Sequence, residues 1–124
     1  TIINMTKEIG NRPWGHYIVL LDSEQCKVKK ITVNPNQRLS YQSHEKRREQ
    51  WTVVEGELPV VLDGEEHTVY AGSSIHIPLG SKHRAWNQTG EELSFIEVQT
   101  GDYFGEDDII RYEDVYSRGH GAKG

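Results

Sequence analysis

Residues 36–56 read NQRLSYQSHEKRREQWTVVEG, and the polar residues in this stretch stand at fixed distances from its closing glycine. Counted back from Gly56, Glu49 lies seven residues earlier, His44 five residues before that, and Gln42 two before that. Because Gln42 and His44 are two apart, their side chains point to the same face of a strand. The stretch therefore presents an amide oxygen, an imidazole and a carboxylate as candidate ligands of one site.

A second stretch, residues 72–87, reads GSSIHIPLGSKHRAWN and adds a further imidazole. His83 follows Pro78 and Gly80, which predict a turn into a new strand. Together the two stretches offer a mixed nitrogen and oxygen ligand set of the kind that binds a divalent metal such as zinc. Since the set contains no thiolate, manganese, iron, cobalt and nickel remain alternatives.

The rest of the chain alternates apolar and polar residues in short segments, as strands do. Examples are HYIVLL, KVKKITV, LPVVLD, HTVYAG and LSFIEVQ, separated by Gly, Pro, Asn or Asp. Asp63-Gly64 is a strong signal for a two-residue hairpin. This pattern predicts an all-β sandwich or barrel in a single domain over residues 1–124. Helical turns are predicted only in residues 105–118, GEDDIIRYEDVYSR, whose acidic start would suit a helix N-terminus.

The composition limits the class of protein. The 124 residues carry 14 Lys and Arg against 19 Asp and Glu, a net charge of −5, which argues against general binding to nucleic acid or to an anionic membrane. The single cysteine, Cys26, excludes an internal disulfide framework and fits a reducing compartment. No apolar run reaches the length of a membrane span, and the N-terminal residues lack a signal-peptide pattern. We therefore expect a cytoplasmic location.

The two stretches are similar to the paired motifs of the cupins. The order Gln42-x-His44-x4-Glu49-x6-Gly56 follows the first motif, and Gly72-x5-Pro78-x-Gly80-x2-His83-x3-Asn87 follows the second. Two positions of the first motif differ, since Gln42 stands where most cupins have histidine and Asn36 where they have glycine. The resemblance implies a double-stranded β-helix, or jelly-roll barrel, with Gln42, His44, Glu49 and His83 as the metal ligands.

The amide at Gln42 and the flanking segments resemble one cupin family, the type II phosphomannose isomerase domain. The segments NRPWGHYIVL, KVKKITVNPNQRLSYQSH and EVQTGDYFGEDDIIRYEDVYSR carry the resemblance, which covers a core of about residues 12–118. It implies a homodimer that binds one divalent metal, zinc in the first place, and interconverts mannose 6-phosphate and fructose 6-phosphate through a cis-enediol. Because no Gly-rich nucleotide loop precedes residue 12, we expect a stand-alone isomerase domain.

The same resemblance suggests which residues meet the substrate. Glu97 matches the family and is the candidate base that moves the proton between C1 and C2. The candidate phosphate-binding cations are Lys29, Arg38, Arg47, Lys82 and Arg111. Lys29 shares strand parity with the apolar Ile31 and Val33, so it must reach a partner or an open cavity. The acidic run at residues 106–108 is interpreted as structural.

Two alternatives stay open. Many family members have histidine at the positions of Glu45, Lys46 and Gln50, and this departure keeps a non-catalytic cupin in view. Such a protein would bind a sugar phosphate or a separate nucleotidyltransferase chain. The second alternative is another cupin enzyme, such as a metal dioxygenase or a sugar-nucleotide epimerase. A dioxygenase normally has more histidines around its iron, so Gln42 argues against it.

Overall fold

A computed structural model describes residues 8–113 of the chain, and within this range every regular element is a strand. The strands, in chain order, are β1 Ile9–Arg12, β2 Gly15–Asp22, β3 Cys26–Val33, β4 Tyr41–Ser43, β5 Arg47–Glu55, β6 Glu57–Leu62, β7 Glu65–Tyr70, β8 Ser74–Ile77, β9 His83–Ala85, β10 Leu93–Gly101 and β11 Ile110–Glu113. No helix in this part of the chain is long and apolar enough to cross a membrane.

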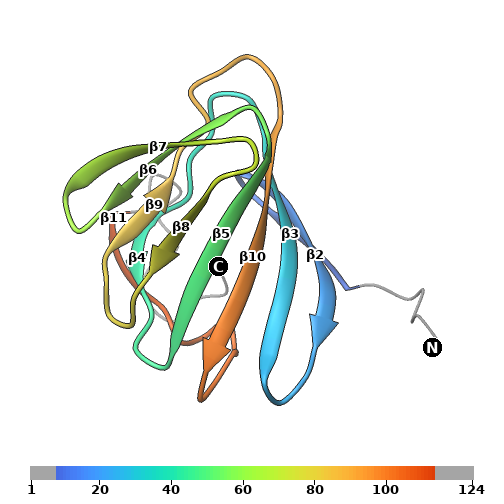
Figure 1. Cartoon of the computed structure of the whole chain (residues 1–124), viewed down its shortest axis with the longest axis vertical. Helices are drawn as coiled ribbons and strands as arrows, with labels where there is room; N and C mark the ends of the chain where they lie inside the picture. The colour runs from blue at the N-terminus through green and yellow to red at the C-terminus, as the bar shows by residue number, and fades with distance from the viewer. Residues whose placement is uncertain (1–7, 114–124) are drawn as a thin grey trace.

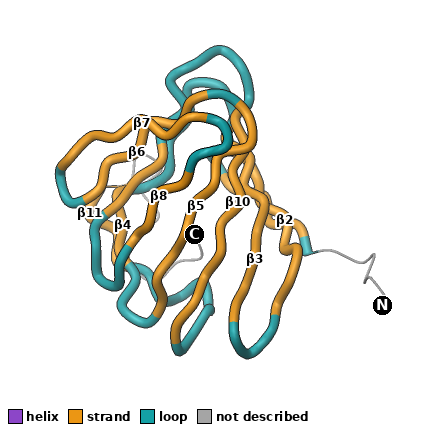
Figure 2. Tube along the Cα trace, viewed as in Figure 1, coloured by secondary structure: helices purple, strands orange, loops and turns teal. Residues whose placement is uncertain are grey.

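The strands form two sheets that face each other (Figures 1 and 2). One sheet has the order β1-β2-β3-β10-β5-β8, and the other has the order β11-β4-β9-β6-β7. Strand pairs in both sheets are antiparallel. This arrangement confirms the predicted all-β cupin architecture.

The core lies between the sheets and follows the alternation of the sequence. In β5, Glu49, Trp51 and Val53 all point inward and are buried, whereas Gln50 between them is exposed. The Trp51 ring packs on Phe95 of β10 with centroids 4.7 Å apart. Apolar residues of both sheets complete the core, among them Val33, Leu58, Val60, Ile77 and Ala85. One end of this interior is apolar, and the other carries the polar side chains of the site.

Two predicted backbone features are confirmed. Asp63 and Gly64 connect β6 and β7 with φ values of 48° and 83°, as the hairpin requires. Asn36 has a φ of 59° at the position where cupins have glycine, and asparagine tolerates this left-handed conformation better than most residues.

The prediction of helical turns near the C-terminus is wrong for the described part of that segment. Residues 110–113 form β11, which pairs antiparallel with β4, while residues 114–118 lie outside the described range. The acidic start resembled a helix N-terminus, but Ile109 and Arg111 are buried against the sheet. The backbone of this segment therefore bonds across to β4 instead of within a helical turn.

Candidate functional site

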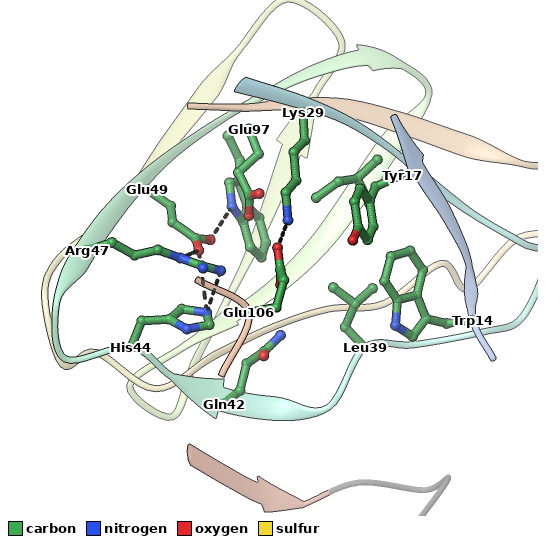
Figure 3. A pocket seen from close by; sticks show the side chains of 12 residues that line it. Trp14, Tyr17, Lys29, Leu39, Gln42, His44, Arg47, Glu49, Glu97 and Glu106 are labelled. Atoms are coloured by element: carbon green, nitrogen blue, oxygen red, sulfur yellow. Dashed lines mark hydrogen bonds and ion pairs between the residues drawn. The ribbon is translucent and has the colours of Figure 1, made fainter. Parts of the chain in front are cut away.

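A pocket opens between the two sheets at the polar end of the interior (Figure 3). Its lining divides into an apolar wall of Trp14, Tyr17, Ile31, Leu39 and Trp51, a group with metal-ligand chemistry of Gln42, His44 and Glu49, and four charged side chains, Lys29, Arg47, Glu97 and Glu106. These residues come from the first motif stretch, residues 36–56, and from segments before and after the two motifs.

His44, Glu49 and His83 form a buried cluster beside this pocket. One ligand atom from each lies within 4.8 Å of the other two. His44 Nε2 is 3.4 Å from Glu49 Oε2, and His83 Nε2 is 3.8 Å from Glu49 Oε1. Strand β5 supplies Glu49, strand β9 supplies His83, and the turn between β4 and β5 supplies His44. The three residues therefore converge from both motifs onto one point.

The hydrogen bonds of the two imidazoles turn the Nε2 nitrogen of each ring toward Glu49. His44 Nδ1 lies 2.5 Å from the carbonyl oxygen of Asp108, and His83 Nδ1 lies 2.9 Å from that of Ser81. A carbonyl only accepts, so both Nδ1 atoms carry the proton and both Nε2 atoms present a lone pair toward Glu49. His83 Nε2 is buried and has no hydrogen-bond partner in the described part of the chain, and a bound metal would supply that partner.

Charge in the cluster also suits a cation. Burial, then the charges of Arg47 and His83, lower the pKa of His44 to about 3, so its imidazole is neutral at neutral pH. Burial raises the pKa of Glu49, but Arg47 and His83 outweigh it and bring this pKa to about 2. A metal ligand must be a neutral imidazole or an ionised carboxylate, and His44 and Glu49 meet these conditions. These residues fit a divalent metal ion.

Gln42 adds a fourth candidate ligand from β4. It is buried, lines the pocket and stands directly opposite His83 in the register of β4 and β9. Its amide oxygen would complete the set of an amide, two imidazoles and a carboxylate that the sequence predicts.

Arg47 is held within the cluster. Its Nε donates to Glu49 Oε2 at 2.8 Å, and its Nη2 lies 3.3 Å from His44 Nε2. Trp51 Nε1 donates to the other Glu49 oxygen at 2.9 Å. The guanidinium therefore supplies the positive charge that balances the buried Glu49.

Glu97 stands on β10, paired in register with Lys29 on one side and Trp51 on the other. Gln99 Nε2 donates to Glu97 Oε2 at 2.8 Å. Burial first, then the negative charge of Glu49 and a hydrogen bond with it, raise the pKa of Glu97 to about 7. A carboxyl group with this pKa exchanges a proton readily near neutral pH.

Comparison with known proteins finds a match over most of the chain. The family model described as the mannose-6-phosphate isomerase C-terminal domain matches residues 3–114. The chain belongs to this family. It is 44% identical over 107 residues to the mannose-1-phosphate guanylyltransferase ManC of Salmonella typhimurium, covering 86% of this chain and 22% of the relative. The chain thus spans about a fifth of the length of the curated relatives it matches.

Solved structures agree on the fold. A double-stranded β-helix protein from Klebsiella pneumoniae superposes with a TM-score of 0.68 at 23% identity, covering 78% of this chain and 83% of that one. A sugar phosphate isomerase of the cupin superfamily from Silicibacter pomeroyi gives a TM-score of 0.60 at 25% identity, covering 68% of this chain and 59% of that one.

The residues singled out by resemblance to the mannose-6-phosphate isomerase family fall into two groups. Lys29, Arg47 and Glu97 line the pocket with Gln42, His44 and Glu49. Arg111 is buried and pairs in register with Gln42.

Arg38 and Lys82 lie away from the pocket lining. Arg38 Nη2 bonds to Glu113 at 3.0 Å, and the exposed Lys82 has its Nζ 4.4 Å from the Tyr112 ring centroid. The residues that replace family histidines, Glu45, Lys46 and Gln50, are exposed and are absent from the pocket lining.

Glu106 is the one charged residue of the pocket lining that the sequence did not single out. It belongs to the acidic run interpreted as structural, yet it lines the pocket and forms an ion pair with Lys29. The signal that pointed to it was indirect, because Lys29 on an apolar face required some partner. Its neighbour Asp108 does have a structural role, accepting the backbone N–H groups of Glu45 and Lys46 at 3.2 and 3.0 Å.

Proposed function

We propose that this chain is a metal-dependent aldose-ketose isomerase that interconverts mannose 6-phosphate and fructose 6-phosphate through a cis-enediol. The observation that carries the proposal is the buried His44–Glu49–His83 cluster, two members of which, His44 and Glu49, line the same pocket as Glu97. Membership of the mannose-6-phosphate isomerase family supports it, as does the likeness to a sugar phosphate isomerase of the same fold.

Gln42, His44, Glu49 and His83 would hold one divalent ion, zinc in the first place, with manganese, cobalt, nickel or iron as alternatives. When bound, such an ion would polarise the substrate oxygens at C1 and C2 and offset the negative charge that develops during proton transfer.

Glu97 would move the proton. As a carboxylate it removes the proton from C2 of the aldose; the C2–H electron pair forms the C1–C2 double bond, the C1 carbonyl pair moves to O1, and O1 takes a proton to give the enediol. The protonated carboxyl then returns a proton to C1 while the O2 hydroxyl releases its proton and becomes the C2 carbonyl, so the ketose forms without net gain or loss of atoms. A pKa near 7 lets both forms of this group be populated, and the apolar wall of Trp14, Tyr17 and Trp51 limits exchange with water.

Lys29 and Arg47 are the cations best placed to bind the phosphate, because both are buried and both line the pocket. A charge-assisted contact to a phosphate oxygen is strongest in such a partly closed site. The resemblance also suggested three further phosphate-binding cations that do not line the pocket, and they would reach the phosphate from outside it: Arg38, Lys82 and Arg111.

A coupled assay tests the proposal. The chain is loaded separately with zinc, manganese, cobalt and nickel, its metal content is measured, and the conversion of mannose 6-phosphate is followed. Turnover with at least one metal is expected. Absence of turnover with every metal, in protein shown to contain metal, would overturn the proposal.

A second candidate is a non-catalytic cupin that binds a sugar phosphate or a nucleotidyltransferase partner. The observation that favours it is the departure at Glu45, Lys46 and Gln50, which stand where many family members have histidine. Saturable binding of mannose 6-phosphate without turnover would favour this candidate over the isomerase.

A further inference from the structure

Lys29 and Glu106 form an ion pair inside the pocket, although they lie 77 residues apart in the chain (Figure 3). Lys29 projects from β3 and is only 3% exposed, and its Nζ lies 4.1 Å from the centroid of the Tyr17 ring. Glu106 comes from the segment between β10 and β11, and 14% of its side chain is exposed. The pair therefore places an acidic group of a surface segment against a cation of the interior.

Arg47 makes the surroundings of Glu106 more positive. Burial raises the pKa of Glu106, but the charges of Lys29 and Arg47 outweigh it and lower this pKa below its usual value. Glu106 is thus ionised at neutral pH. We call Lys29 and Arg47 together the cation cradle of the pocket. Arg47 Nη1 is buried and has no hydrogen-bond partner among the described residues, so the cradle keeps one N–H donor without an acceptor.

The segment that carries Glu106 is anchored next to the metal-type cluster by another residue. Asp108 accepts backbone N–H groups from Glu45 and Lys46, and its carbonyl contacts His44. These contacts do not involve the Glu106 side chain. Rotation about its side-chain bonds would take the carboxylate out of the cradle while the Asp108 contacts stay in place.

We propose that Glu106 is an internal competitor for the anion site of this pocket, and that the phosphate group of a sugar phosphate binds by displacing its carboxylate from Lys29 and Arg47. A phosphate monoester brings more charge and one more terminal oxygen than a carboxylate, so it satisfies both cations and the free Arg47 donor together. A neutral sugar has no charge with which to replace Glu106. The ion pair thus selects for phosphorylated ligands, and this inference rests on the proposed sugar-phosphate function.

Binding measurements on the full chain as purified, with its metal content determined, test the inference. Inorganic phosphate, mannose 6-phosphate and mannose are titrated by calorimetry into the wild type, Glu106→Gln and the control Glu57→Gln at constant ionic strength. Glu57 is exposed on β6, so its change alters net charge by the same amount away from the pocket. We expect Glu106→Gln to bind inorganic phosphate and mannose 6-phosphate at least about tenfold more tightly than wild type, and the control to match wild type.

Two further variants keep the test decisive. Glu106→Asp retains the charge but shortens the reach to Lys29, so a smaller gain in phosphate affinity is expected even if the glutamine variant folds poorly. The double variant Lys29→Met/Glu106→Gln should lose the gain, because the receiving cation is absent. Unchanged or weaker phosphate binding in both folded Glu106 variants, or no phosphate binding by any variant, would overturn the inference.

The outcome separates this inference from the proposed function. If Glu106→Gln binds phosphate more tightly but no metal supports turnover, the internal competitor stands and the isomerase proposal falls. If turnover occurs and Glu106→Gln shows no gain, the isomerase stands and the competitor falls.

Discussion

Gln42 and His83 are direct partners across the antiparallel strands β4 and β9. They come from different sequence motifs and lie 41 positions apart, and their pairing, together with that of β5 and β8, sets the first motif against the second. His44 and Glu49 then reach the same point from the turn and strand that follow Gln42. Formation of the metal-type cluster is therefore coupled to the pairing of two short strands.

His83→Ala should abolish metal binding. The substitution removes one of three convergent ligands, whose buried Nε2 has no hydrogen-bond partner within residues 8–113. Elemental analysis after metal loading and desalting measures the result. His76→Ala is the control, because His76 is exposed and bonds to Gln50 on the outer face of the sheet. Stoichiometric metal retained by His83→Ala would show that the ligand set is wrong.

Arg47→Met should destabilise the metal-free chain by about 3 kcal/mol, because removing one partner leaves a buried charge uncompensated. Arg47 is 4% exposed and balances Glu49 through its 2.8 Å hydrogen bond. Denaturant unfolding measures the change in the free energy of unfolding.

The neighbouring Arg48→Met provides the control, since Arg48 is exposed on the same strand. Its unfolding free energy should stay within about 0.5 kcal/mol of wild type. Equal effects of the two substitutions would contradict the assignment of Arg47 as the counter-charge of the site.

The sequence predicted the fold and the cluster because both depend on local patterns. Alternation fixes which face of β5 is buried, and the spacing of two residues puts Gln42 and His44 on one face. The parity of Lys29 with Ile31 correctly predicted a lysine buried on the core face.

Features that depend on distant contacts were harder to predict. The partner of Lys29 is Glu106, which no local pattern connects to β3. The acidic residues 106–108 resembled a helix start, but the residues after them form β11 through pairing with β4. Arg38 and Lys82 were chosen by their match to a family, and that match carries no information on which way a side chain points.

Asn87→Ala should destabilise the chain by about 2 kcal/mol, because it leaves several buried polar groups without partners. The Asn87 side chain is fully buried, and its Nδ2 donates to the carbonyls of Val33, Asn34 and Glu91. Its Oδ1 accepts the backbone N–H of Thr89 at 2.9 Å.

The exposed neighbour Gln88 supplies the control for this change. Gln88→Ala should leave the midpoint of denaturant unfolding near that of wild type. A similar loss in both variants would mean that Asn87 does not hold this turn.

Gly101→Ala should be more destabilising than Gly64→Ala, by about 2 kcal/mol. Both glycines have positive φ, 141° and 83°, so both substitutions strain the backbone. A Cβ at Gly101 would also meet the backbone at the start of β5, including the Arg47 Cα at 2.8 Å, whereas no atom of the described residues lies within 4 Å of a Cβ at Gly64. Thermal or denaturant unfolding compares the two, and equal losses would contradict the close approach of β10 to the turn that carries Arg47.

Glu97→Gln should lower the rate of sugar-phosphate isomerisation by at least about a hundredfold while metal content stays at the wild-type level. The amide keeps the size of the side chain and its place beside Trp51 and Lys29, but it cannot take up the substrate proton. Glu92→Gln is the matched control, because Glu92 is exposed just before the same strand. Glu97→Gln with wild-type turnover would assign the proton transfer to another group. Loss of metal together with activity would instead make Glu97 a residue that supports the Glu49 ligand, since the two carboxyl groups are hydrogen-bonded.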